Sequence, residues 1–156
     1  MTQLNQITLD SQLCFALYTA NKKYNHFYQE ALAPFNLTYS QYIALLSLYE
    51  QAPMTVKELG NHLNLDSGTL TPLLKRLEKQ GWVTRTRSTE DERQMIIDLT
   101  KMAQQNQADL YNRVTSCQKL LGLTTDQYQA LVVAVDKISD QLDLVDADHL
   151  IATVPD

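Results

Sequence analysis

Residues 65–93, LDSGTLTPLLKRLEKQGWVTRTRSTEDER, constrain the fold of this chain most strongly. They combine a helix start, a basic amphipathic helix, a glycine that stops the helix and a charged hairpin. This order is that of a recognition helix followed by a wing, which predicts nucleic-acid binding. The small polar start of the helix and the arginines of the hairpin are Ser67, Gly68, Thr69, Thr71, Arg85, Arg87 and Arg93.

The charge of the chain leaves this prediction open. The net charge of −5 at pH 7 argues against a DNA partner. However, seven aspartates and one lysine fall within residues 120–156, so this segment carries −6 and residues 1–119 carry +1. Residues 75–93 hold six of the 13 basic residues, Lys75 and Arg76 among them, together with four acids. Such a cluster fits a solvated helix face as well as a DNA-contacting face.

Bulk properties indicate one globular domain in the cytoplasm. The chain has 156 residues, of which 44% are hydrophobic and 20% charged. No apolar run approaches the roughly 18 residues that span a bilayer, and MTQLNQITLD does not resemble a signal peptide, so no membrane association is expected. The two cysteines, Cys14 and Cys117, form no Cys-x-x-Cys and no histidine stands at metal-ligand spacing. We therefore expect no metal and no cofactor, and either inert buried thiols or a redox pair.

Helix signals divide the N-terminal two thirds of the chain. The first helix is expected to begin at Asp10 or Ser11 and to end near Ala33, before Pro34. Capping-box spacing opens a helix at Thr38 and another at Thr55. The latter and the helix that follows Asn64 form a helix-turn-helix.

The start of the recognition helix is ambiguous because of Pro72. Asp66 or Ser67 is a good N-cap, but a helix that begins there leaves Pro72 in its interior. With Thr71 as the cap, Pro72 would take the first helical position and the helix would be shorter. The sequence does not decide between these starts.

The remaining elements predict a hairpin and two long helices. Residues 83–87 and 94–99 are β-prone runs around a polar turn, and helices follow from Thr100 and after Thr124. The resulting fold class is mainly α: a winged helix-turn-helix with a small β-hairpin wing, dimerised through its N- and C-terminal helices. We expect a single winged-helix domain over residues 1–142, with an acidic tail over 143–156. Within it, the dimerisation helices span 10–33 and 101–142 and the DNA-binding part spans about 38–100.

The order of elements resembles the MarR family of dimeric winged-helix transcription regulators over nearly the whole chain. Within this family the chain is similar to the organic-hydroperoxide-sensing repressors, which carry LCFALY, here Leu13–Tyr18, and TYSQY or TYPQY, here Thr38–Tyr42. The resemblance implies a DNA-binding regulator, not an enzyme, that releases its operator when a cysteine is oxidised.

The resemblance also implies roles for individual residues. Cys14 takes the position of the peroxide-reactive cysteine, Tyr28 and Tyr39 those of tyrosines that hydrogen-bond its sulfur, and Tyr18 that of a nearby aromatic residue. Cys117 is implied as the resolving thiol of the other subunit, although its place on an apolar stripe also fits a core residue. The implied DNA contacts are Ser67, Gly68, Thr69, Thr71, Pro72, Lys75 and Arg76 on the helix, and Arg85, Arg87, Asp91 and Arg93 on the wing, with Asp91 as the salt-bridge partner of Arg93.

Helix geometry makes the implied thiol site a property of a homodimer. Tyr28 follows Cys14 by 14 residues on one helix, which is about 21 Å along its axis. Tyr28 therefore cannot reach Cys14 of its own chain, and the partner subunit must supply it. Ordinary helix packing is the competing explanation for both residues.

Two other functions remain open from the sequence. One is a MarR-type regulator that responds to a small phenolic ligand or to another oxidant. The other is a thiol peroxidase, which the absence of Cys-x-x-Cys disfavours. For the regulator, two-fold symmetry predicts a near-palindromic operator in double-stranded DNA with half-sites about one helical turn apart.

Overall fold

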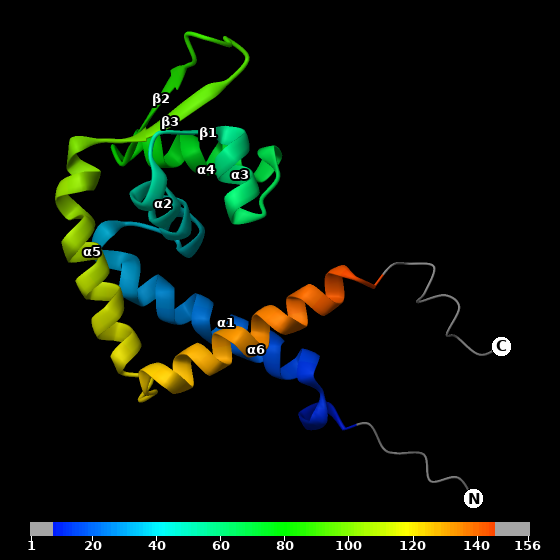
Figure 1. Ribbon diagram of the computed structural model, residues 1–156. Coiled ribbons are helices and arrows are strands. Elements are labelled where there is room, and N and C mark those ends of the chain that lie inside the picture. The colour runs from blue at the N-terminus through cyan, green and yellow to red at the C-terminus, as the bar shows by residue number, and fades with distance from the viewer. Residues whose placement is uncertain (1–7, 146–156) are drawn as a thin grey trace, which may run out of the picture. The chain divides into compact units, whose positions relative to one another are not determined.

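The computed structural model describes residues 8–145, and its mainly α-helical content confirms the expected fold class (Figure 1). Short 3₁₀ helices flank the first α-helix at Leu9–Ser11 and Ala33–Phe35. Two compact units meet at the Cys117–Gln118 bond. The elements are α1 (Leu13–Leu32), α2 (Tyr39–Gln51), β1 (Met54–Thr55), α3 (Val56–Leu63), α4 (Ser67–Lys79), β2 (Val83–Arg87), β3 (Met95–Leu99), α5 (Lys101–Lys119) and α6 (Thr125–Asp143).

Capping boxes begin three of these helices, as the sequence predicts. At the start of α3, the Glu58 backbone N–H donates to Thr55 Oγ1 at 3.1 Å, and the Thr55 N–H donates to the Glu58 carboxylate at 2.7 Å. The same reciprocal pair occurs at Thr38 for α2 and at Thr124 for α6. These bonds satisfy backbone donors that a helix start otherwise leaves without a partner.

The first helix begins later than the sequence predicts. A 3₁₀ turn covers Leu9–Ser11, and Gln12 then takes an extended conformation before α1 begins at Leu13. The Ser11 hydroxyl donates to the Thr8 carbonyl at 2.8 Å, which closes this turn on itself and separates it from α1. Cys14 consequently lies in the first turn of α1.

The helix-turn-helix is formed by α3 and α4. Asn64 ends α3 in the left-handed conformation at φ 52°, and the Leu65 N–H donates to the Gly60 carbonyl at 2.9 Å. A Cβ at position 60 would lie 2.9 Å from the Leu65 carbonyl oxygen, so the turn requires glycine there. This close approach fixes the angle at which α4 leaves the turn.

The wing is a hairpin within a three-stranded antiparallel sheet of order β1-β3-β2. Strands β2 and β3 match the two predicted runs, and Val83 pairs with Leu99. The sequence prediction missed β1, in which Met54 pairs with Ile97. Two residues directly before a helix cap are too few to produce an alternating pattern. In Figure 1 the hairpin extends beyond α3 and α4.

The core lies between α2, α4 and the sheet. Leucines of the two helices pack against Ile97 of β3, which is fully buried, and α5 adds Ala103, Leu110 and Val114. Because an apolar side chain contributes about 1.5–3 kcal/mol when fully buried, this cluster dominates the stability of the first unit. Its largest fully buried members are Leu32, Leu45, Leu48, Leu59, Leu70, Leu74, Leu77, Ile97, Leu110 and Val83.

The second unit contains α6, which has no buried residue over its length. Leu131, Val133 and Val135 of α6 are all exposed. The tail predicted over residues 143–156 lies outside the described residues after Val145. None of the helices within residues 8–145 has the length and apolar character that crossing a membrane requires.

Candidate nucleic-acid interface and thiol site

Helix α4 separates an apolar face from a polar face. Its four buried residues are leucines that enter the core at positions 70, 73, 74 and 77. This spacing places them on one side of the helix, so the opposite side faces solvent. The exposed residues include most of those predicted to contact DNA: Ser67, Gly68, Thr69, Pro72, Lys75 and Arg76, with Thr71 half-buried.

The structure resolves the start of α4 in favour of Asp66 as its cap. The Asp66 carboxylate accepts hydrogen bonds from the Thr69 backbone N–H at 2.9 Å and from the Thr69 hydroxyl at 2.8 Å. These bonds hold the pKa of the Asp66 carboxyl below its usual value. Pro72 therefore lies inside the helix, where it has no N–H to donate to the Gly68 carbonyl one turn earlier.

Asp91 organises the tip of the wing. Its carboxylate accepts from the Arg93 backbone N–H and from the Gln94 side chain, both at 3.1 Å. The ion pair expected between Asp91 and Arg93 is not present in the described part of the chain. The carboxylate instead caps one backbone N–H of the turn and holds the Gln94 amide, and the Arg93 side chain is exposed at the tip.

Arg85 connects the wing to α4. Its Nη1 lies 3.3 Å from the Glu78 carboxylate, and its side chain is only 16% exposed. Its Nε is buried and has no hydrogen-bond partner in the structure. Arg87, in contrast, lies exposed at the end of β2, and its Nη1 donates to the Glu92 carbonyl at 3.4 Å. Arg85 thus holds the wing against the recognition helix, and its predicted phosphate contact stays a prediction.

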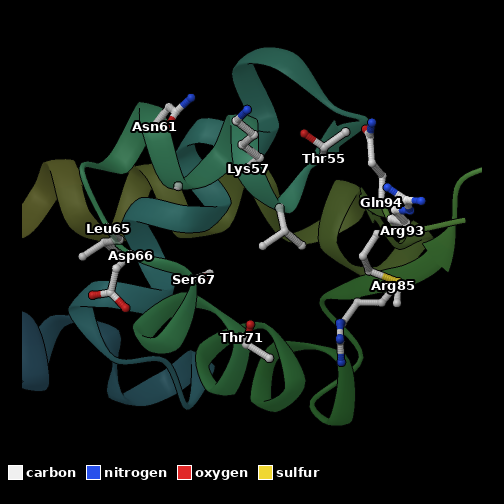
Figure 2. Close-up of a pocket in the computed structure, with 13 residues that line it drawn as sticks. Thr55, Lys57, Asn61, Leu65, Asp66, Ser67, Thr71, Arg85, Arg93 and Gln94 are labelled. Carbon is white, nitrogen blue, oxygen red and sulfur yellow. The ribbon is translucent and has the colours of Figure 1, made fainter. Parts of the chain in front are cut away.

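A cavity of about 570 Å³ lies between α3, the start of α4 and the wing (Figure 2). Three basic side chains line it: Lys57, Arg85 and Arg93. Ser67 and Thr71 of α4 also line this space (Figure 2). The Asp66 carboxylate lines the same space, so its charge is mixed, and the basic side chains beside the first turn of α4 are the part that suits a phosphate group of a nucleic-acid backbone.

Among the residues that line this cavity, sequence reasoning did not assign the basic Lys57 or the uncharged polar Thr55, Asn61 and Gln94 to the site. One local signal was available for Lys57, which is exposed in the first turn of α3. A cation is unfavourable near the positive end of a helix, so a lysine there suggests that an anion binds nearby. The other three are placed by the turn between α3 and α4 and by the wing.

Cys14, the predicted reactive cysteine, is exposed in the first turn of α1. The N-terminal N–H groups of a helix point outward and stabilise negative charge, and a thiolate is the form of cysteine that reacts with peroxides. Tyr18, one turn later, is 64% exposed. The structure therefore leaves the thiol accessible in the first turn of α1.

The two predicted sensor tyrosines meet at the other end of α1. The ring centroids of Tyr28 and Tyr39 are 4.5 Å apart, which joins α1 to the start of α2. Tyr24, Phe27 and Tyr42 complete an aromatic cluster around Tyr28, which is buried. The structure thus brings Tyr28 and Tyr39 together but not with Cys14 of the same chain, which lies about 21 Å away along α1.

Cys117, the predicted resolving residue, lies in the last turns of α5 and is partly exposed. The buried residues of α5 are Ala103, Leu110 and Val114, so Cys117 is not part of the closed core. Both cysteines are free thiols.

Known proteins resemble this chain in both sequence and fold. A family model described as MarR family matches residues 37–95, from the residue before the α2 cap to the start of β3. The organic hydroperoxide resistance transcriptional regulator of Bacillus subtilis is 50% identical over 99 residues, which cover 64% of this chain and 67% of the relative. The chain belongs to the MarR family.

Solved structures of a MarR-family relative extend the match to most of the chain. Reduced AbfR bound to DNA is 41% identical, with a TM-score of 0.75, and the match covers 86% of this chain and 94% of that one. A structure of disulfide-formed AbfR is also 41% identical, with a TM-score of 0.65, over 83% and 91% of the two chains. AbfR comes from Staphylococcus epidermidis.

Membership in the MarR family confirms two predictions made from the sequence. The chain is a winged-helix regulator, and its curated relatives are named transcriptional regulators rather than enzymes. The thiol peroxidase alternative is thereby set aside. The family match does not assign roles to individual residues.

Proposed function

We propose that this MarR-family protein is a homodimeric repressor that leaves its DNA operator when organic hydroperoxide oxidises Cys14. The proposal rests chiefly on the arrangement of α1, which carries an exposed thiol in its first turn and the Tyr28–Tyr39 pair at its other end. In an antiparallel pairing of two α1 helices, each thiol lies beside the tyrosines of the other chain. Two such sites form per dimer.

On DNA, α4 lies in the major groove and the wing follows the backbone. Small polar residues at the start of α4, Ser67, Thr69 and Thr71, face base edges, while Lys75 and Arg76 bind phosphates. The cavity between α3, α4 and the wing receives a phosphate group next to Lys57 and Arg85. Arg93 at the wing tip extends into the minor groove and responds to its width. The two-fold axis of the dimer predicts a near-palindromic operator.

The chemical step changes the oxidation state of sulfur. The Cys14 thiolate attacks the terminal oxygen of the hydroperoxide, the O–O bond breaks, and the alkoxide takes a proton and leaves as an alcohol. Sulfur is oxidised to a sulfenic acid and the peroxide is reduced. A second thiol then attacks the sulfenic sulfur, forming a disulfide and releasing water. Cys117 of the other subunit is the proposed second thiol, and its partial exposure supports that role.

The two cysteines make the experiment simple, because each single substitution leaves one thiol. An operator is first selected from a random-sequence duplex pool with the reduced protein. Its affinity is then measured by fluorescence anisotropy before and after addition of cumene hydroperoxide, on the wild type, Cys14→Ser and Cys117→Ser. We expect the oxidised wild type to release DNA, Cys14→Ser to stay bound, and only the wild type to form a cross-linked dimer on a non-reducing gel.

Three outcomes contradict parts of the proposal. Release of DNA by Cys14→Ser in hydroperoxide removes the thiol from the mechanism and favours another signal, such as a small phenolic ligand. Absence of a cross-linked dimer in the oxidised wild type removes Cys117 and leaves a small cellular thiol as the second thiol. Failure of the reduced protein to select any duplex removes the operator itself.

A further inference from the structure

A chain of amide hydrogen bonds connects the start of α2 to the end of the recognition helix. Gln41 is 4% exposed, and its Nε2 donates to Gln80 Oε1 at 3.0 Å. The Gln80 Nε2 donates in turn to the Asn36 carbonyl at 2.8 Å. Gln41 Oε1 accepts from the Thr38 backbone N–H at 2.9 Å as part of the capping box of α2. Both polar atoms of the Gln41 amide therefore have partners in a nearly closed environment.

One end of this chain adjoins the sensor tyrosines. Tyr39 is the first residue of α2, directly after the cap Thr38, and its ring contacts that of Tyr28. Any displacement of Tyr39 moves the first turn of α2, and with it Gln41, which lies in the same turn. The first turn of α2 thus connects the Tyr28–Tyr39 pair directly to Gln41.

The other end of this chain is the recognition helix. Gln80 is the C-cap of α4, and its backbone N–H donates to the Arg76 carbonyl. Helix α4 has 13 residues, which makes it about 20 Å long. The buried leucines of α4 hold both sides of Pro72 in one core, so a shift at Gln80 is carried to Ser67 and Thr71 at the reading end.

A second contact lies beside the first. The rings of Phe35, in the connection between α1 and α2, and Trp82, just after α4, are 6.4 Å apart. Trp82 is 4% exposed and is the only tryptophan in the chain. Its fluorescence therefore reports on this junction without any label.

We propose that Gln41 and Gln80 are positioning residues that transmit the oxidation state of the thiol site to α4. This inference rests on the proposed function, in which Tyr28 and Tyr39 serve Cys14 of the partner subunit. Gln41 is nearly closed to solvent, so separating its side chain from that of Gln80 leaves the Gln41 amide donor without a partner, which makes this hydrogen bond a stiff link. Movement of α2 consequently draws the end of α4 with it.

Gln41→Glu removes the amide donor that Gln41 offers to Gln80 and keeps the oxygen that the capping box uses. A glutamate still accepts from the Thr38 N–H, so the capping box remains. It cannot donate to Gln80 Oε1. In its present orientation, Gln80 keeps its bond to the Asn36 carbonyl and loses the bond to residue 41. If the Gln80 amide rotates, its NH₂ donates to the new carboxylate, but its oxygen then faces the Asn36 carbonyl and that bond is lost. Gln51→Glu is the matched control, because it makes the same change at an exposed position on the same helix.

The measured quantity is the ratio of operator Kd after and before treatment with cumene hydroperoxide, using the duplex selected by the reduced wild type. We expect this ratio to fall by about tenfold in Gln41→Glu, within the range of ordinary allosteric coupling, and to be unchanged in Gln51→Glu. The oxidation-dependent change in Trp82 emission, measured without DNA, falls in parallel. Gln41→Glu combined with Gln80→Lys restores both signals, since a lysine donates to the carboxylate and to the Asn36 carbonyl.

The outcomes separate this inference from the proposed function. If the wild type keeps its operator in hydroperoxide, the proposed function is wrong and the inference falls with it. If the wild type releases DNA and a folded Gln41→Glu variant does so equally, only the inference is overturned. Gln80→Ala provides the same test from a half-exposed helix end, with folding checked by circular dichroism. A full ratio in that variant also overturns the inference.

Discussion

Helices α4 and α6 differ in how they use their apolar residues. Helix α4 buries four leucines, three of them completely, against α2 and the sheet. Helix α6 also presents a row of aliphatic side chains at heptad-like spacing, but Leu131, Val135 and Leu142 are between 45% and 65% exposed. The first half of α1 resembles α6, since its buried residues all lie from Tyr28 onward. One chain therefore contains a closed core and two open apolar faces.

This contrast separates a winged helix that buries its own apolar side chains from two helix faces whose apolar side chains remain exposed. The winged helix satisfies its apolar groups, capping donors and strand pairs internally. An exposed aliphatic row on a long helix is instead typical of an interface. In the proposed homodimer, the two open faces are covered by a second copy of the chain, and the thiol site forms in the same place.

The largest expected effect comes from comparing a buried leucine of α4 with an exposed leucine of α6. Leu74→Ala in α4 removes a fully buried side chain, so the free energy of unfolding should fall by about 2–5 kcal/mol at every protein concentration. Leu131→Ala in α6 removes a side chain that is 53% exposed, so its cost should appear only where the dimer forms. Urea denaturation over a hundredfold range of concentration measures both. An equal, concentration-independent loss in Leu131→Ala would place α6 in a monomer core.

The second prediction concerns the polar surface that the closed winged helix leaves exposed. Arg93→Ala removes an exposed cation from the wing tip, so DNA affinity should fall by about tenfold and the salt dependence by about one charge. Arg85→Ala removes a side chain paired with Glu78, so it should lower thermal stability as well. Titrations at several salt concentrations and a melting curve separate the two arginines. A stability loss in Arg93→Ala equal to that in Arg85→Ala would show that both are structural.

Sequence patterns predicted the local structure of the winged helix well, for physical reasons. Capping boxes at Thr38, Thr55 and Thr124 are encoded within four residues, and each is formed as expected. The two long strands alternate and flank a polar turn, so the hairpin was also predictable. The cap of α4 was not, because Asp66 and Pro72 give opposing local signals. The two hydrogen bonds that Thr69 donates to the Asp66 carboxylate, with packing of Leu70 and Leu73, outweigh the missing N–H of Pro72.

These local patterns could not predict contacts between segments that lie far apart in the sequence. Strand β1 exists only because β3 pairs with it, and Lys57 lines the cavity only because the turn at Asn64 directs α4 toward the wing. The Gln41–Gln80 bond joins residues 39 positions apart. The roles of Cys14, Tyr18, Tyr28, Tyr39 and Cys117 came from resemblance and remain predictions. The structure adds the contact between Tyr28 and Tyr39.

The smallest expected effect tests the connection between the closed core and the long helix that leaves it. The Tyr49 hydroxyl on α2 donates to the Ala103 carbonyl on α5 at 2.7 Å. Burial and the neighbouring Tyr111 raise the pKa of Tyr49 from 10.0 to about 12. Since the folded state favours the protonated phenol, its contribution to stability is complete below pH 10 and is lost as the pH rises through about 12. Tyr49→Phe should cost about 1 kcal/mol at pH 7 and should flatten the decline in stability between pH 10 and 12. Urea denaturation across this pH range, with Tyr128→Phe at a half-buried position on α6 as the control, measures the change. An unchanged alkaline decline in Tyr49→Phe would show that another group weakens the fold there and that the bond between α2 and α5 contributes little.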